Sequence, residues 1–203
     1  MKFIIKKFWK AVDKMDKKRI SSQTAPQGLV TLTDIPYMAG GNPMHTLDIY
    51  YKEGVTEAQP VIFDIHGGGW VYGSKELNKY FCMDLALRGF TVVNINYRLT
   101  TEAVFPTCVK DIFAALEWIC KEGKKYYADT DKMCVAGDSA GAHLALITAI
   151  VTKNAELQRE LNIAPVADIK ALGLICGAFD IEKYMKLRIM RGYQKLIFGD
   201  DYT

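Results

Sequence analysis

The chain has 203 residues, half of them apolar, and a formal net charge of +3. This length and hydrophobic content predict one large folded domain and exclude a largely disordered protein. The positive charge is concentrated in residues 1–19, which contain eight Lys or Arg and two Asp, while the rest of the chain contains 18 basic and 21 acidic side chains. Because the body of the protein has no excess of basic residues, we expect no nucleic-acid partner.

The five cysteines are widely spaced and never form the short pairs that zinc or redox sites use. We expect reduced thiols, no metal and no cofactor. Lys6 and Lys7 interrupt the apolar residues at the N-terminus, so this segment does not have the pattern of a secretory signal. No stretch is long enough to span a membrane, and we expect a cytoplasmic location.

The first predicted element is a helix over residues 3–15, where apolar side chains recur at helical spacing and lysines fill the other faces. We interpret it as a helix packed over its own domain, with contact to a membrane surface as the alternative. A joint follows at residues 24–28, which include Pro26 and Gly28. We therefore divide the chain into a basic amphipathic segment, residues 1–28, and a main domain, residues 29–203.

Residues 29–38 and 45–52 are rich in β-branched and aromatic side chains and flank a turn cluster, which predicts an antiparallel hairpin. The chain then alternates between short apolar runs and helical segments. The apolar runs are residues 61–65, 90–95, 132–136 and 169–179, and the helical segments are residues 77–88, 108–121 and 140–151. This alternation predicts an α/β fold with a mostly parallel sheet covered by helices on both faces. We expect a polar connection at residues 152–168 and no further strand after residue 180.

The strongest chemical signal is a Gly-x-Ser-x-Gly sequence at residues 137–141, between a predicted strand and a predicted helix. A serine at such a sharp turn takes strained backbone angles that expose its hydroxyl, and the flanking glycines let neighbouring segments approach closely. The helix N-terminus also favours an anionic tetrahedral intermediate at this position. Ser139 is therefore the predicted nucleophile.

A second motif, His66-Gly-Gly-Gly-Trp70, follows the strand predicted at residues 61–65. Consecutive glycines leave backbone N–H groups able to point at a substrate oxygen, as an oxyanion hole requires. We predict such donors at Gly67, Gly68 and Gly69. The N–H of Ala140, directly after the serine, is the further predicted donor.

These two motifs, together with residues 96–99 (Asn-Tyr-Arg-Leu) and 105–106 (Phe-Pro) between them, resemble the hormone-sensitive-lipase-like carboxylesterases of the α/β-hydrolase fold. The likeness covers about residues 30–180. It implies a serine carboxylesterase that acts on small acyl esters through Ser139, with an N-terminal segment that contributes to a cap over the pocket. Residues 137–144 are also similar to the arylformamidases, whose scissile bond is an amide, and an amide hydrolase is therefore an alternative.

The family places its catalytic acid and histidine after the serine in the chain. Here the only histidines are His45, His66 and His143. His143 is four residues beyond the serine and lies one turn down the predicted helix, so we predict a packing role for it. We expect His66 to order the glycine loop, which consists of residues 67–69.

Candidate acids do follow the serine. Asp180 occupies a position that the family uses structurally, and Asp200 and Asp201 lie in the terminal tail. An acid without a histidine has nothing to orient, so we expect the chain alone to be weakly active or inactive. The resemblance implies two further strands that we do not find, so we expect an incomplete hydrolase domain with an open sheet edge that permits self-association. An inactive hydrolase-like binding protein is the alternative to an esterase.

Overall fold

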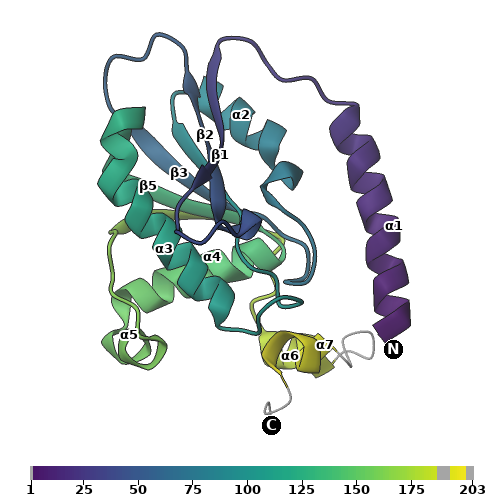
Figure 1. Ribbon diagram of the computed structural model, residues 1–203. Coiled ribbons are helices and arrows are strands. Elements are labelled where there is room, and N and C mark those ends of the chain that lie inside the picture. The colour runs from purple at the N-terminus through teal and green to yellow at the C-terminus, as the bar shows by residue number, and fades with distance from the viewer. Residues whose placement is uncertain (1, 187–192, 200–203) are drawn as a thin grey trace.

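The computed structural model describes residues 2–186 and 193–199, with side chains from Lys7 onward. The helices are α1 (Lys2–Ser21), α2 (Lys79–Leu87), α3 (Thr107–Glu122), α4 (Ala140–Lys153), α5 (Ala155–Leu161), α6 (Ile181–Lys186) and α7 (Tyr193–Phe198). The strands are β1 (Leu29–Pro36), β2 (Thr46–Lys52), β3 (Gln59–Ile65), β4 (Thr91–Ile95), β5 (Ala128–Asp138) and β6 (Ile169–Ile175). Three short 3-10 turns, η1 (Pro43–His45), η2 (Lys75–Leu77) and η3 (Gly123–Tyr126), connect these elements (Figure 1).

The strands form one six-stranded sheet in the order β1-β2-β4-β3-β5-β6. β1 and β2 make the antiparallel hairpin, and β2 also runs antiparallel to β4. β4, β3, β5 and β6 run parallel to one another. The prediction of a mostly parallel sheet that carries an N-terminal antiparallel hairpin is confirmed.

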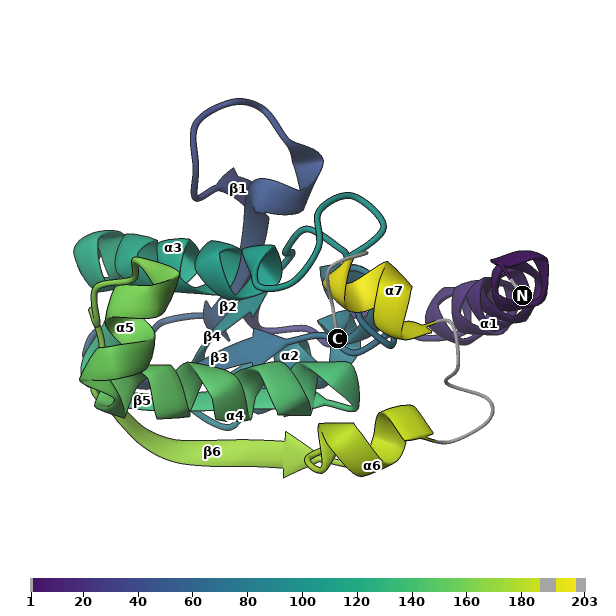
Figure 2. The same ribbon diagram turned by 90° about the horizontal axis from the view of Figure 1, so that it is seen from below.

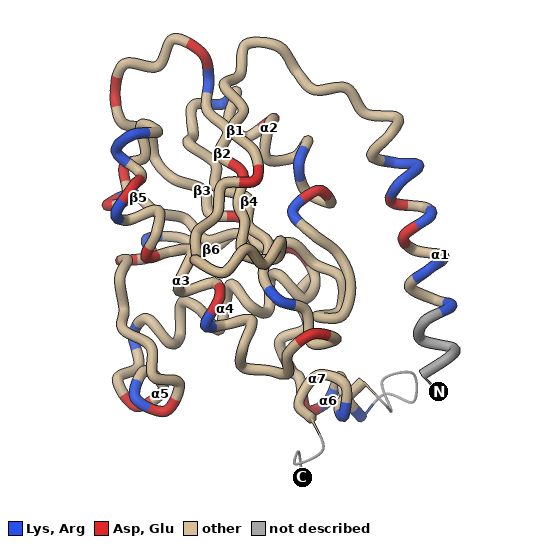
Figure 3. The backbone as a smooth tube through the Cα atoms, viewed as in Figure 1, with Lys and Arg blue, Asp and Glu red and all other residues tan. Residues whose placement is uncertain are grey.

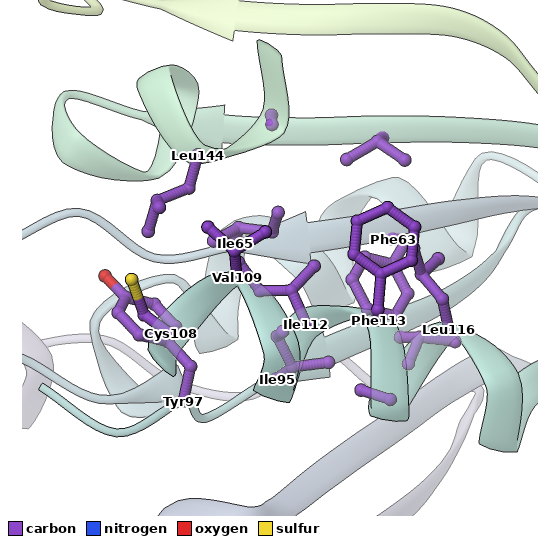
Figure 4. Packing of buried hydrophobic residues seen from close by; sticks show 14 of the residues in the cluster. Phe63, Ile65, Ile95, Tyr97, Cys108, Val109, Ile112, Phe113, Leu116 and Leu144 are labelled. Carbon is purple, nitrogen blue, oxygen red and sulfur yellow. The ribbon is translucent and has the colours of Figure 1, made fainter. Parts of the chain in front are cut away.

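Helices cover both faces of this sheet because side chains alternate along each strand. Phe63 and Ile65 of β3 face the larger core, where they pack with α3 and with Leu144 of α4 (Figure 4). Ile62, between them, faces α2 in a smaller core on the other side of the sheet. Both faces are therefore apolar at β3, which explains why this strand reads as a continuous apolar run.

The parallel register brings the two chemical motifs together. Ile65 at the end of β3 is paired with Gly137 near the end of β5. The glycine loop follows β3 and the serine turn follows β5, so both lie at the carboxyl edge of the sheet, where open α/β sheets bind their ligands.

One segment differs from the sequence prediction. The connection at residues 152–168 contains α5, whose first turn is capped by the Asn154 side chain, which accepts hydrogen bonds from the N–H groups of Glu156 and Leu157. The segment after residue 180 contains α6 and α7. The described part of that segment holds no strand, and β6 lies at one edge of the sheet (Figure 2). In the described ranges, every helix is too short or too polar to cross a bilayer.

Candidate active site

Ser139 occupies a tight turn between β5 and α4. Its φ and ψ angles are 52° and −115°, a left-handed combination that a side chain rarely adopts. The turn is held by a hydrogen bond of 2.7 Å from the Ser139 N–H to the carbonyl oxygen of Ile175, at the end of β6. The residue is exposed, so its hydroxyl is accessible to a ligand.

The glycines on either side of the serine are required by close backbone contacts. A Cβ on Gly141 would lie 1.9 Å from the carbonyl oxygen of Ile65, and a Cβ on Gly137 would lie 2.5 Å from the carbonyl carbon of Gly141. No side chain fits at such distances. Both glycines of the Gly-x-Ser-x-Gly sequence are therefore needed for β3, β5 and α4 to pack this closely.

The glycine loop is shaped by left-handed backbone angles, with φ of 116° at Gly68 and 59° at Gly69. The Gly67 N–H donates to Asp138 Oδ1 at 2.9 Å, which ties the loop to the residue before the serine. The Gly68 carbonyl accepts from the N–H groups of Val71 and Tyr72. Within the part of the chain that the structure describes, the N–H groups of Gly68 and Gly69 have no acceptor.

A half-buried amide joins two carboxylates behind this loop. Asn78 Nδ2 donates to Asp138 Oδ1 and to Asp64 Oδ2, both at 2.9 Å. Asp64 is 1 % exposed, and its Oδ1 has no hydrogen-bond partner among the described residues. Burial, with a smaller contribution from the negative charge of Asp138, raises the pKa of Asp64 to about 7, although the hydrogen bond from Asn78 acts in the opposite direction.

His66 fixes the start of the glycine loop. Its ring is fully buried and stacks on the ring of Tyr97 with centroids 4.4 Å apart. Its Nδ1 lies 2.7 Å from the carbonyl oxygen of Gly67, and because a carbonyl can only accept, Nδ1 is the donor. Burial lowers the pKa of the ring to about 4, so His66 is neutral at pH 7. The ring orders the loop rather than taking up protons.

His143 lies one turn along α4 from Ser139. Its ring meets Trp70 edge-on at 5.4 Å, and burial lowers its pKa to about 4. No hydrogen bond joins this ring to the Ser139 hydroxyl in the described structure, where Nδ1 is buried without a partner. The ring lines a cavity of about 250 Å³ whose other walls are apolar. Those walls come from Trp70, Phe105, Ile147, Ile181, Met185, Ile197 and Phe198.

Trp9 of α1 covers the glycine loop from outside. A Cβ on Gly69 would lie 2.7 Å from Cζ2 of Trp9, so a glycine is needed for the indole to lie this close. The indole stacks on Tyr72 with centroids 5.0 Å apart. Its Nε1 donates to the Tyr193 hydroxyl of α7 at 2.5 Å. The N-terminal helix and a C-terminal helix therefore meet above the loop.

Comparison with known proteins decides the family. The model of the BD-FAE family matches residues 47–193, a span that includes the glycine loop and the serine turn. The chain belongs to the BD-FAE family.

Named relatives of this BD-FAE chain are esterases. It is 29 % identical over 145 residues to esterase LipC of Mycobacterium tuberculosis, which is 70 % of this chain and 36 % of LipC. It is 27 % identical over 159 residues to the isoprenylcysteine alpha-carbonyl methylesterase ICME of Arabidopsis thaliana, covering 78 % of this chain and 37 % of that protein. Among solved structures, esterase B from Lactobacillus rhamnosis inhibited with a tributyrin phosphonate gives a TM-score of 0.92 at 31 % identity.

The structural match covers 97 % of this chain and 64 % of esterase B. It confirms the α/β-hydrolase fold and the resemblance to hormone-sensitive-lipase-like carboxylesterases. The alternatives of an amide hydrolase and an inactive binding protein are not favoured by these relatives. The chain spans a little over a third of the length of the curated relatives and just under two thirds of esterase B.

Two other candidate groups of this BD-FAE chain, Asp180 and His45, bind elsewhere in the described structure. Asp180 accepts a hydrogen bond of 2.9 Å from the Lys183 N–H and so caps α6. His45 lies 3.5 Å from Asp111, a buried carboxylate that also binds Arg98. Asp200 and Asp201 lie outside the described residues. The described residues therefore place no histidine beside the Ser139 hydroxyl.

Three contributors to the site were not predicted from the sequence: Asp64, Asn78 and Trp9. Asp64 had a signal, because an aspartate inside the apolar run at residues 61–65 is unusual for a strand buried on both faces. Asn78 and Trp9 had none, since their partners lie 60 and 184 residues away in the chain.

Proposed function

We propose that the protein is a serine carboxylesterase for small acyl esters, with Ser139 as the nucleophile. The observation that carries this proposal is the exposed serine in a strained turn at the N-terminus of α4, beside a glycine loop with two N–H groups that have no acceptor in the described structure. Family membership and the esterase relatives support the same reaction.

The oxyanion hole in this proposal consists of the N–H groups of Gly68, Gly69 and Ala140. Ala140 is the first residue of α4, so its N–H has no partner within the helix. Gly67 has a different role from the one predicted from the sequence, because its N–H is bound by Asp138. We assign Gly67 to holding the loop in place. Loss of one oxyanion donor typically costs about 10²–10³ in turnover.

The acyl group of the substrate occupies the apolar cavity of about 250 Å³ beside Trp70 and His143. Apart from the imidazole ring of His143, the cavity is lined by apolar side chains, which suits a short acyl chain rather than a charged group. The tributyrin phosphonate inhibitor of esterase B, which carries C4 chains, supports short acyl groups. α1 acts as part of a cap, since Trp9 lies over the glycine loop.

In the reaction, the Ser139 oxygen attacks the ester carbonyl, the negative charge forms on the carbonyl oxygen, and the alcohol leaves with a proton. Water then releases the acid from the acyl-serine. The serine proton needs a base, and none of the three histidines in these 203 residues follows His143. The widely spaced cysteines are all free, and we propose a cytoplasmic location on that ground.

The test is hydrolysis of p-nitrophenyl butyrate by the 203-residue chain with free imidazole as the external base, compared with Ser139→Ala. Ser22→Ala is the matched control, since Ser22 is exposed and remote from the turn. We expect a rate that depends on Ser139, is unchanged in Ser22→Ala, and falls when decanoate replaces butyrate. Equal rates for wild type and Ser139→Ala would reject the proposal.

A further inference from the structure

The outward side of α1 carries an exposed apolar row. Phe8 is 54 % exposed and Met15 is 72 % exposed, and Ala11 lies between them at the spacing of one helix face. The opposite side of the helix rests on the body, where Trp9 stacks on Tyr72 and Arg19 donates to the Leu77 carbonyl at 3.1 Å. Large apolar side chains are thus left in solvent on the side of α1 that faces away from the body.

A row of lysines runs beside this apolar row. Lys10, Lys14 and Lys18 follow one another at intervals of four residues and are exposed. In the described structure these three ammonium groups have no ion-pair partner, because the two acids of the helix are paired elsewhere. Those pairs are Asp13 with Lys17 at 2.8 Å and Asp16 with Arg19 at 3.1 Å. The positive charge of the lysine row is therefore not neutralised by the helix.

Charge is segregated between this helix and the rest of the molecule. Residues 1–19 contain eight basic and two acidic side chains, whereas the remainder contains 18 basic and 21 acidic ones. Figure 3 shows the Lys and Arg positions along α1, which lies at one side of the body. A negatively charged surface would therefore attract α1 and repel the body, which fixes one orientation of approach.

We propose that the outward face of α1 docks on the surface of an anionic lipid bilayer. Phe8 and Met15 would enter the boundary between headgroups and acyl chains, while the lysine stems cover apolar surface and their ammonium groups contact lipid phosphates. A bilayer fits better than a nucleic acid, because a nucleic acid offers no apolar layer for the row of Phe8, Ala11 and Met15.

Docking in this way places the cap beside lipid. Trp9, on the inner side of the same helix, contacts the loop at Gly69, so a bilayer bound to the outward face of α1 is separated from the glycine loop by that helix. The inference goes beyond the proposed function and does not depend on it, because Ser139 is not part of the outward face of α1. Ser139→Ala should bind vesicles as wild type does, whatever its activity.

The experiment is flotation of the full chain with vesicles of equimolar phosphatidylglycerol and phosphatidylcholine, and with vesicles of phosphatidylcholine alone. We expect binding to the anionic vesicles only, with loss at high salt. Charge reversal of Lys10, Lys14 and Lys18 to Glu should lower vesicle partitioning by about a hundredfold or more. Phe8→Ala with Met15→Ala should lower it by about tenfold. Circular dichroism checks that each variant remains folded.

Matched controls change the same residue types on the body. Reversal of the exposed Lys52, Lys110 and Lys124 to Glu alters the net charge equally, and Phe81→Ala with Ile150→Ala removes side chains that are 44 % and 46 % exposed. We expect both controls to bind as wild type does. Three results would overturn the proposal: no flotation of wild type with anionic vesicles, equal loss in the body controls, or a dimer that Phe8→Ala with Met15→Ala dissociates.

Discussion

At the scale of single residues, Asp64 is the least expected feature of the site. It occupies a strand position that faces the smaller core, and its carboxyl group is linked through Asn78 to Asp138, which holds the glycine loop. A carboxylate in this position is costly because one oxygen has no partner within the described structure. A protonated carboxyl group avoids most of that cost, which is the physical reason for its raised pKa.

This raised pKa predicts a pH dependence of stability. The pKa of Asp64 is about 7 in the folded protein and about 4 in an unfolded chain. The folded state therefore holds one more proton between these values, so Asp64 lowers the free energy of unfolding as pH rises from about 4 to about 7. Asp64→Asn removes this effect. Chemical denaturation should find the variant about 2–4 kcal/mol more stable relative to wild type at pH 8 than at pH 4.

Asp84→Asn is the matched control, because Asp84 is 61 % exposed on α2. Its stability difference from wild type should stay nearly constant over the same range. A constant difference for Asp64→Asn as well would show that Asp64 has no raised pKa in the folded protein.

At the scale of elements, α1 is held to the body at separated points. Trp9 anchors one part and Arg19 the other, and between them lies a cavity of about 570 Å³ lined in part by Asp16, Tyr72 and Leu77. The Tyr72 hydroxyl also donates to Asp16 Oδ2 at 3.3 Å. Because the indole packs on Tyr72 and bonds to α7, we expect the protection of α1 from hydrogen exchange to depend strongly on Trp9.

Trp9→Ala is therefore expected to release α1 without unfolding the sheet. The loss of the stacking and of the hydrogen bond to Tyr193 should lower the local opening free energy of α1 by about 1–3 kcal/mol. Hydrogen–deuterium exchange should become faster in residues 7–21 and stay unchanged in β3 and β5. Met15→Ala, which truncates a side chain of α1 that is 72 % exposed, is the control and should leave exchange unaltered. Faster exchange across the whole sheet would contradict a local role.

β6 is an exposed strand at the edge of the sheet. It pairs with β5, and no strand pairs with its other side in the described ranges. Leu172 and Ile175 are 36 % and 45 % exposed. An apolar edge of this kind favours association between copies. We expect the 203-residue chain to associate with rising concentration in sedimentation velocity, and Leu172→Lys to suppress this.

Ile150→Lys introduces the same charge on α4, at a residue that is 46 % exposed, and should leave association unchanged. If Leu172→Lys associates as readily as wild type, the contact lies elsewhere.

The elements were predictable where local pattern and packing agree. β3 and α4 were expected within a few residues of their observed bounds, because an apolar run and an apolar helical face each signal burial. α5 was missed because it contains few apolar residues and depends on the Asn154 cap. In the site, Ser139 and the glycine loop were visible because close backbone contacts dictate their residue types. The contacts of Asn78 and Trp9 join distant parts of the chain, so no local pattern encodes them.

At the scale of the whole molecule, the fold gathers three features at one end of the sheet. The serine turn follows β5, the glycine loop follows β3, and α1 with α7 covers that loop. The apolar cavity lies next to these features and is closed partly by α6 and α7. In the proposed function, this one region holds the nucleophile, the oxyanion hole and the acyl site.

The central claim is that Ser139 is the nucleophile of this region. It is tested most directly by treating the chain with p-nitrophenyl butylphosphonate and imidazole, followed by peptide mapping by mass spectrometry. The Ser139 oxygen would bond to phosphorus as p-nitrophenolate leaves and imidazole takes the proton. We predict one butylphosphonyl group on Ser139, formed at least about tenfold faster than any modification of Ser139→Ala. Modification of Ser139→Ala at the wild-type rate, or a label on another residue, would contradict the account.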